Sequence, residues 1–177
     1  MSLREHSIFD CIINNALNFS DEIALVSGDL RLTYGEVPSH VNSLARGLLN
    51  MGFEKGERIG VLLNNCAEYA LLLAACARIG LITVCLNPRT SADEMRKILK
   101  QAKPKALIFQ KSYEEQADEL RELGIHRQLY CIDDASILSS SFDQLLDEDS
   151  SPLTESQPDV DDGWLIIPTA AVDGVPK

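Results

Sequence analysis

The last nine residues of the chain have the residue types of a phosphate-binding segment. The apolar run WLIIP, residues 164–168, is typical of a short strand, and TAAVDGVPK follows it as residues 169–177. Small residues and Gly174 let backbone N–H groups approach an anion, and Lys177 adds a positive point charge. Asp173 places a carboxylate in the same segment, where it would repel a phosphate. The segment lacks the GxxxxGK[ST] spacing of a Walker loop, so taken alone it could equally be an ordinary turn after a strand.

Histidine and cysteine show no spacing that is typical of a catalytic or metal site. His6, His40 and His126 lie far apart, and none stands near a cysteine or carboxylate at the spacing of a metal site or a catalytic triad. The five cysteines are odd in number and form no close pair, which argues against a disulfide framework or a zinc site and favours a reducing compartment. We therefore assign no catalytic residue and no metal ligand, and we predict a cytoplasmic protein.

Composition restricts the class of protein and of partner. With 177 residues, 45% of them hydrophobic, the chain is long enough for one domain with a sizeable core. Sixteen Lys and Arg against 27 Asp and Glu give a formal net charge of -11, which disfavours nucleic acid and anionic membranes as partners. The longest apolar run, residues 70–86, is interrupted by Arg78 and Gly80. It therefore predicts a helix followed by a strand, and no transmembrane segment is expected.

The first third of the chain predicts a helix, a β-hairpin and a second helix. Apolar residues recur at helical spacing over residues 7–18, and the Gly-Asp pair at 28–29 separates two short β-like runs. Thr33 and Glu36 have the spacing of a capping box, and apolar residues over 37–49 fall on one face of a helix.

The middle of the chain alternates regularly between strands and helices. The expected strands are RIGVLL, LITVCL, ALIF and QLYCI, and the expected helices cover residues 66–79, the stretch from the Ser91 and Glu94 capping box to Pro104, and residues 112–123. Strands joined through helices of this length imply right-handed crossovers. The predicted fold class is α/β, with a largely parallel sheet flanked by helices on both faces, preceded by the N-terminal helix and hairpin.

The chain is expected to form a single domain over residues 1–177 that contains one unusual segment. Residues 133–163 are acidic and serine-rich, and they predict a surface excursion with one short helix near residues 142–146. The excursion could dock a basic partner, but a solvated loop is the ordinary outcome for such a charge run. Residues 164–177 then supply a strand that rejoins the sheet, followed by the phosphate-loop-like end.

Three stretches, in their order along the chain, resemble the N-terminal core motifs of the adenylate-forming acyl-CoA synthetases, the AMP-binding superfamily that includes the fatty-acid-CoA ligases. These are LTYGEV at residues 32–37, ARIGLITVCLNP at 77–88, and the terminal TAAVDGVPK, which aligns with T-S-G-T-T-G-x-P-K. The resemblance covers nearly the whole chain and implies the fold described above. It also implies ATP, Mg²⁺ and coenzyme A as cofactors of a longer enzyme, a carboxylic acid such as a fatty acid as substrate, and the rest of the enzyme as partner.

By this resemblance the first two motifs are mainly structural, and the third wraps the β- and γ-phosphates of ATP. The sequence keeps Thr169, Gly174, Pro176 and Lys177, but it has AAVD at 170–173 where the family has Ser, Gly, Thr and Thr. Three hydroxyl contacts are absent, whereas the backbone donors remain. The candidate cofactor-binding residues are Thr169, Ala170, Ala171, Val172, Asp173, Gly174 and Lys177.

The resemblance implies that the chain alone is inactive and binds no cofactor, because the family's adenine and acyl pockets, Mg²⁺-binding glutamate and lid lysine all follow the third motif. Two alternatives stay open. The altered third motif favours a non-catalytic binding or regulatory module, and the same three motifs also occur in adenylating enzymes that load a carrier protein or an amino acid. An apolar face left exposed for docking would permit self-association.

Overall fold

The computed structural model describes residues 6–121, 128–133, 139–154 and 159–168 of the 177. The chain divides into two compact units, each built from separate stretches. The first comprises Met1–Gly56, Asn65–Leu81 and Leu145–Trp164, and the second comprises Glu57–Asn64, Ile82–Gln144 and Leu165–Lys177. The single domain expected from the sequence stays a prediction, and each unit is described by itself.

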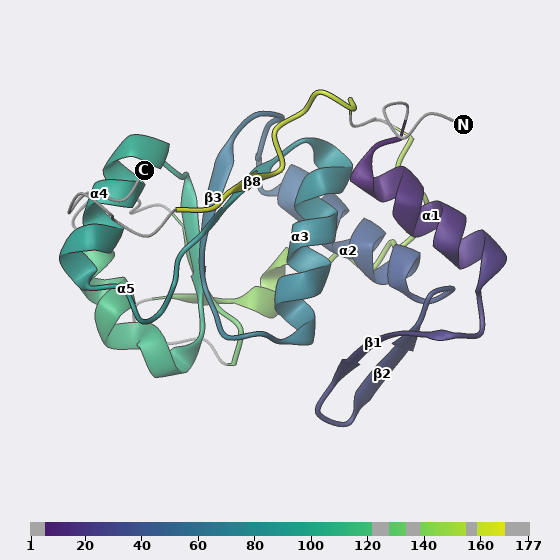
Figure 1. The fold of residues 1–177 in the computed structure, drawn as a ribbon, viewed down its shortest axis with the longest axis horizontal. Helices are drawn as coiled ribbons and strands as arrows, with labels where there is room; N and C mark the ends of the chain where they lie inside the picture. Colours follow the sequence, from purple (N-terminus) through teal and green to yellow (C-terminus); the bar gives the residue numbers. More distant parts are fainter. Residues whose placement is uncertain (1–5, 122–127, 134–138, 155–158, 169–177) are drawn as a thin grey trace. The chain divides into compact units, whose positions relative to one another are not determined.

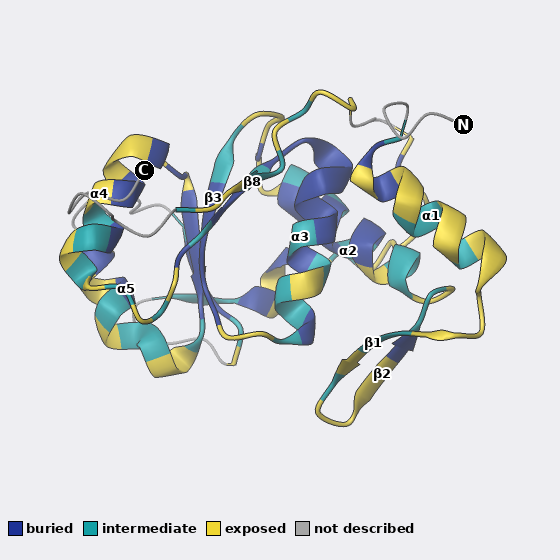
Figure 2. Cartoon of the chain, in the orientation of Figure 1, coloured by how far each residue is buried: buried dark blue, intermediate teal, exposed yellow. Residues whose placement is uncertain are grey.

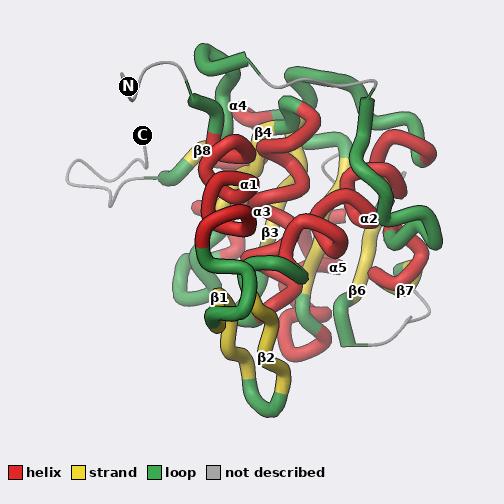
Figure 3. Tube along the Cα trace, turned by 90° about the vertical axis from the view of Figure 1, so that its right-hand side faces the viewer, coloured by secondary structure: helices red, strands yellow, loops and turns green. Residues whose placement is uncertain are grey.

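The first unit contains three helices and a hairpin. Helices α1 (Ile8–Asn18), α2 (Val37–Asn50) and α3 (Ala67–Ile79) pack against one another, and the antiparallel strands β1 (Ile23–Ser27) and β2 (Leu30–Thr33) project from them (Figures 1 and 3). Gly28 turns the hairpin with a φ of 58°, a left-handed conformation that favours glycine. The N-terminal helix and the hairpin are both confirmed.

Helix α2 begins later than the capping-box pattern predicts. The N-cap residue is Glu36, and no side chain caps the helix. Glu36 Oε2 instead accepts hydrogen bonds from the backbone N and the Oγ1 of Thr33, at 2.8 and 3.0 Å. The predicted capping box therefore forms only in its glutamate half. The backbone N of Glu36 donates to the carbonyl oxygen of Thr33, so the pair closes a turn that precedes the helix.

Helix α3 is buried along most of its length, as its apolar sequence predicts, whereas α1 is mostly exposed (Figure 2). It ends at Gly80, which adopts a left-handed conformation with a φ of 71°. Arg78 is buried near this end, with its guanidinium 4.6 Å from the centre of the Phe9 ring and a donated hydrogen bond to the carbonyl oxygen of Leu153. The arginine that interrupts the apolar run thus joins α1 and the 145–164 stretch to α3.

The acidic stretch is attached to helix α2 over residues 145–151. Ser43 Oγ donates to the carbonyl oxygen of Asp147, and Arg46 donates to the carbonyl oxygens of Asp149 and Ser151. Leu145 and Leu153 are buried. The stretch is therefore acidic on its exposed side chains but contributes two leucines to the core of the first unit.

The second unit is built on a six-stranded sheet with the strand order β7-β6-β5-β3-β4-β8. Its strands are β3 (Arg58–Leu62), β4 (Ile82–Cys85), β5 (Ala106–Phe109), β6 (Leu129–Cys131), β7 (Ser140–Ser141) and β8 (Leu165–Ile166). Every neighbouring pair is parallel. The expected largely parallel sheet flanked by helices is confirmed, and so is the return of the chain to the sheet after residue 164. Strand β7 was not foreseen from the sequence.

Helices α4 (Ala92–Ala102) and α5 (Glu114–Arg121) pack on one face of this sheet. Alternate residues of four strands, such as Leu62, Val84 and Leu107, form one buried cluster with Met95 and Leu120 of the two helices. Ser91 and Glu94 form the predicted capping box at the start of α4. A 3₁₀ turn, η2 (Lys111–Tyr113), precedes α5, and a second one, η3 (Phe142–Leu145), follows β7 where the short helix was expected. None of the helices in the described ranges is long and apolar enough to span a membrane.

Candidate functional site

The predicted cofactor-binding segment lies outside the described residues, so its conformation remains a prediction. This applies to the whole candidate set, namely Thr169, Ala170, Ala171, Val172, Asp173, Gly174 and Lys177. What the structure does describe is the strand that leads to it. Strand β8 pairs with β4, with Leu165 opposite Thr83 and Ile166 opposite Val84. Pro168 is the last residue described before the segment.

Strand β8, which precedes the candidate segment in the chain, ends at the carboxyl edge of the sheet. Because β8 is parallel to β4 and to the strands beyond it, the chain leaves β8 at the same edge where it leaves β3, β4, β5 and β6. Open α/β sheets bind their ligands at this edge, just beyond the carboxyl ends of the strands. The sheet thus starts the phosphate-loop-like segment at the edge that the fold class uses for binding.

A polar group that the sequence did not single out lies at the same edge, between β3 and β5. The chain leaves β3 toward β4 and leaves β5 toward β6, so these adjacent strands form the topological switch point of the sheet. Gln110 Oε1 accepts from the backbone N and from Nδ2 of Asn64, at 3.3 and 3.0 Å, and Tyr113 Oη donates to Asn64 Oδ1 at 2.6 Å. The only sequence signal for this group was the Asn-Asn pair that follows the strand RIGVLL.

Two further contacts stabilise the loops of this edge. The backbone N of Lys111 donates to Asp133 Oδ2 at 2.7 Å, and the backbone N of Arg89 donates to Asn87 Oδ1 at 2.9 Å. Asp133 stands two residues after the end of β6, and Asn87 stands two residues after the end of β4. In the described ranges no group of three or more His, Cys, Asp or Glu side chains is arranged to hold a metal ion.

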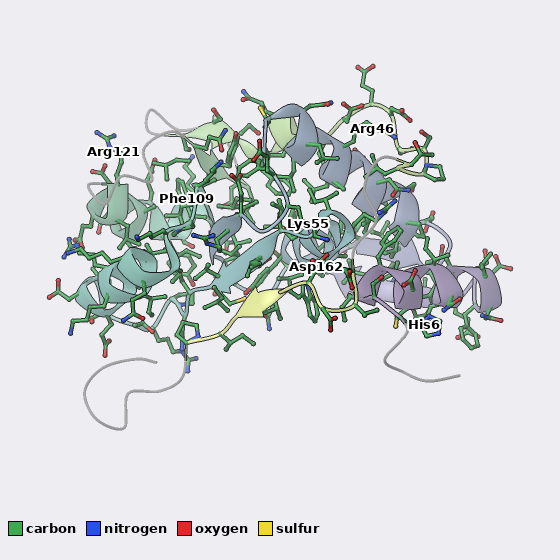
Figure 4. All side chains as sticks on the ribbon, turned by 90° about the horizontal axis from the view of Figure 1, so that it is seen from above. His6, Arg46, Lys55, Phe109, Arg121 and Asp162 are labelled. Atoms are coloured by element: carbon green, nitrogen blue, oxygen red, sulfur yellow. The ribbon has the colours of Figure 1, made fainter. Side chains whose placement is uncertain are left out.

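The residues that precede β8 are held by polar contacts within the first unit. Lys55 Nζ lies 2.8 Å from Asp162 Oδ2, and Figure 4 shows the two side chains side by side. The lysine hydrogen bond lowers the pKa of the Asp162 carboxyl. Trp164 Nε1 donates to the carbonyl oxygen of Leu73 in α3 at 2.9 Å. Trp164 is the single tryptophan of the chain, which is the one signal that could have drawn attention to this stretch.

The other two motifs of the resemblance have structural roles in the described residues. Glu36 closes the turn after the hairpin, and its hydrogen bonds from Thr33 lower the pKa of its carboxyl. Gly80 ends α3 in a left-handed conformation, and its carbonyl oxygen accepts from the backbone N of Gly56. His40 is exposed on α2. His126 lies outside the described residues.

Comparison with known proteins decides the family. A profile described as "AMP-binding enzyme" matches residues 13–177. The chain belongs to the AMP-binding enzyme family. Human mitochondrial medium-chain acyl-CoA ligase ACSF2 is 34% identical over 116 residues, which are 64% of this chain and 19% of that protein. The 4-coumarate–CoA ligase 2 of Petroselinum crispum is 30% identical over 167 residues, which are 92% of this chain and 30% of that protein.

Solved structures agree with the fold. A protein described as a long-chain-fatty-acid CoA ligase of Rhodopseudomonas palustris superposes with a TM-score of 0.88 and 32% identity over 99% of this chain and 44% of its own. The N-terminal domain of FACL13 of Mycobacterium tuberculosis superposes with a TM-score of 0.80 and 24% identity over 97% of this chain and 43% of its own. The resemblance to the N-terminal region of acyl-CoA synthetases is confirmed. The chain spans less than a third of the two curated relatives described above.

Proposed function

We propose that this chain is part of an ATP-dependent acyl-CoA synthetase and supplies its phosphate-binding segment. In the reaction of the whole enzyme, a carboxylate oxygen attacks the α-phosphorus of ATP, forming the acyl-adenylate and releasing pyrophosphate. The thiol of coenzyme A then forms the thioester and releases AMP. The observation that carries the proposal is the family match over residues 13–177, combined with a β8 that pairs in parallel with β4 and ends at the carboxyl edge of the sheet.

The donors of the terminal segment fit a phosphate in part. The hydroxyl of Thr169, the backbone N–H of Gly174 and the ammonium of Lys177 would hold ATP phosphates, each charge-assisted bond contributing roughly 1.5 to 3 kcal/mol. Asp173 opposes them by about 1 to 4 kcal/mol at contact distance. ATP, Mg²⁺ and coenzyme A belong to the proposal for the longer enzyme. No Mg²⁺ ligand is assigned to this chain.

The proposal includes the expectation that the chain by itself neither binds ATP detectably nor catalyses the reaction. It spans less than a third of the curated ligases described above, and the Asp173 carboxylate offsets part of the attraction between its donors and a phosphate. The assay is ATP-dependent pyrophosphate release with a series of fatty acids, run on the chain alone and on the longer protein encoded with it. Release by the longer protein only is the expected result. Release by the chain alone would contradict the inactivity, and no release by either would contradict the enzyme.

The second candidate is a non-catalytic binding or regulatory module, and the substitutions over residues 170–173 favour it. A longer protein that binds a carboxylic acid or CoA without releasing pyrophosphate would support this module. The product assay also separates a third class, since transfer of the acyl group to a carrier protein in place of CoA would identify a carrier-loading enzyme. Neither outcome is compatible with the acyl-CoA synthetase proposed above.

The proposal places the protein in the cytoplasm, which fits the five cysteines, all of them free thiols. Its partners are the remainder of the enzyme and the carboxylic acid substrate. The exposed apolar side chains at the hairpin and the preceding helix end are candidates for the docking face through which the chain would self-associate: Leu17, Phe19, Ile23, Val26 and Leu30. Light scattering over a range of protein concentrations tests this expectation.

A further inference from the structure

The hairpin of the first unit has one face that packs and one that does not. Leu32 is 5% exposed, and Leu25, its partner on β1, is half-buried. On the other face Ile23 is 52% exposed and Val26 is 56% exposed. These two share a face although they are three residues apart, because the register shifts between Ile23 and Leu25. The outer face of the hairpin therefore presents two large apolar side chains to solvent.

Neither strand of the hairpin has a second neighbour in the part of the chain that the structure describes. Strands β1 and β2 pair with each other as a sheet of two strands, and the hairpin projects from the helices (Figure 3). Alternate backbone N–H and C=O groups of each strand therefore point away from the hairpin. A two-stranded hairpin is at best marginally stable in water, and a third strand stabilises it. Exposed β-branched side chains beside an open edge are typical of a site where another strand is added.

The exposed apolar side chains gather along β1 rather than β2. Phe19 is 48% exposed shortly before β1, and its ring centre lies 6.3 Å from that of Tyr34, which follows β2. The residue of β2 opposite Val26 is Arg31, an exposed cation of the kind that protects an edge from pairing. The open edge of β1, over its regular stretch at residues 25–27, is therefore the better site for a third strand.

Acidic residues lie at both ends of this strand. Asp21 and Glu22 precede β1, Asp29 follows it in the turn, and all three are exposed. A segment laid along β1 would meet a carboxylate at each end, so Lys or Arg at its own ends would complement them. A second copy of this chain would not, because an isologous contact sets a patch against itself and brings these carboxylates together. The charges thus favour a partner other than a second copy.

The length of the relatives indicates where such a segment would come from. This chain spans 19% of human ACSF2 and 30% of the Petroselinum crispum ligase, so most of a protein of that size would lie outside it. We propose that the edge of β1 is the docking site for an extended segment of that remainder, apolar on the side that covers Ile23 and Val26 and with Lys or Arg at its ends. The proposal rests on the proposed function only in taking the chain as part of a longer protein.

Residue-resolved amide hydrogen exchange on the longer protein tests the docking directly. In a hairpin without a third strand, only the alternate amides of residues 25–27 that point to β2 are protected. With a third strand the outward amides are protected too, and we expect them to exchange at least about tenfold more slowly than in the isolated chain. Protection of the alternate amides alone would overturn the proposal. Protection that rises with protein concentration would identify a second copy as the occupant, and would overturn it as well.

A matched pair of valine substitutions tests which face is covered. Val26 is 56% exposed and Val160, outside the hairpin, is 48% exposed. Val26→Thr keeps a β-branched side chain but puts a hydroxyl into the proposed contact. In the longer protein we expect it to speed exchange of the outward amides of residues 25–27 about three- to tenfold, whereas Val160→Thr leaves them unchanged. Equal effects of the two variants, or none from Val26→Thr, would contradict the proposed contact.

The salt dependence of self-association tests the choice of partner. The isolated chain has the same hairpin without the proposed segment, so copies that meet through it bring like charges together. Light scattering should therefore show more association at about 500 mM than at about 20 mM NaCl, because salt screens the repulsion. Association that falls as salt is added would show attraction between copies, and a second copy would then be the better occupant.

Pyrophosphate release by the longer protein is measured on the same preparations as hydrogen exchange. Protected outward amides without release would leave the docking in place and contradict the proposed function. Release without such protection would support the enzyme and overturn the docking, so the two proposals fail separately.

Discussion

Gly47 lies inside α2, where the backbone of Leu145 passes too close to leave room for a side chain. A β-carbon at this position of α2 would overlap the carbonyl oxygen of Leu145. Helix propensity alone predicts that Gly47→Ala gains about 1 kcal/mol. We expect a net loss of about 1 to 3 kcal/mol instead, because the Leu145 backbone and the adjacent Ser43–Asp147 hydrogen bond must move. Urea denaturation measures the change, and a more stable variant would show that the 145–151 stretch adapts freely.

Two cysteines of the first unit differ in their expected reactivity. Burial raises the pKa of the Cys66 thiol to about 11, whereas Cys11 is exposed on α1. At pH 8 only about one Cys66 in a thousand would be a thiolate, and the thiolate is the form that reacts. Iodoacetamide followed by peptide mass spectrometry should label Cys11 well before Cys66. Comparable rates in the native state would show that the start of α3 opens readily.

Asp173 is the residue on which the phosphate argument depends most. In the longer protein we expect Asp173→Thr combined with Ala170→Ser to bind Mg-ATP more tightly, because a like charge is removed and two hydroxyl donors are added. Calorimetric titration of the native protein and the double variant measures the difference. Equal or weaker affinity in the variant would mean that Asp173 lies away from the phosphates or helps to hold the metal.

The capping box of α1 is an element-scale feature with a measurable acid dependence. Ser7 Oγ and the Ser7 backbone N both donate to Asp10 Oδ2 at 2.8 Å, and chiefly the Ser7 side-chain hydrogen bond lowers the pKa of the Asp10 carboxyl from its usual 3.8. Because the folded-state pKa lies below the unfolded one, this stabilisation is complete above the usual value and is lost as the pH falls through the folded-state value.

Ser7→Ala should therefore raise the pKa of Asp10 toward 3.8 and reduce stability at neutral pH by about 1 kcal/mol, with a smaller loss in strong acid. A carboxyl-carbon NMR titration and urea denaturation at the two pH values measure both effects. Ser91→Ala removes the same kind of capping box from α4, so it serves as a control that should leave the Asp10 titration unchanged. An unchanged Asp10 titration in Ser7→Ala would show that the serine does not set this pKa.

The elements that could be predicted are those whose local sequence is sufficient to determine them. The capping box at Ser91 and Glu94 formed as predicted, with the backbone N of Glu94 donating to the Ser91 hydroxyl. The same spacing at Thr33 and Glu36 gave a turn, because the backbone N of Glu36 donates to the carbonyl oxygen of Thr33. Strand β7 consists of two serines in an acidic stretch, and only the neighbouring β6 makes it a strand. Contacts between residues far apart in sequence, such as Lys55 with Asp162, leave no local pattern that predicts them.

At the scale of the whole chain, the two units are made of interleaved stretches, which bears on how they unfold. The chain passes repeatedly from one unit to the other, so unfolding of either releases the ends of segments in its counterpart. We expect one cooperative transition in urea. Trp164 emission follows the first unit and far-ultraviolet circular dichroism follows both, so coincident curves are the expected result. Two separate midpoints would show that the units unfold independently.

The strands occur along the chain in an order that builds the sheet from its centre outward as the ribosome releases them. The central strand β3 comes first, β4 and β5 then add on its two sides, β6 follows beside β5, and the two-residue strands β7 and β8 complete the edges last. Every strand therefore finds the neighbour it pairs with already synthesised. A parallel sheet folds slowly when distant segments must search for each other, and growth from the centre outward during translation shortens that search.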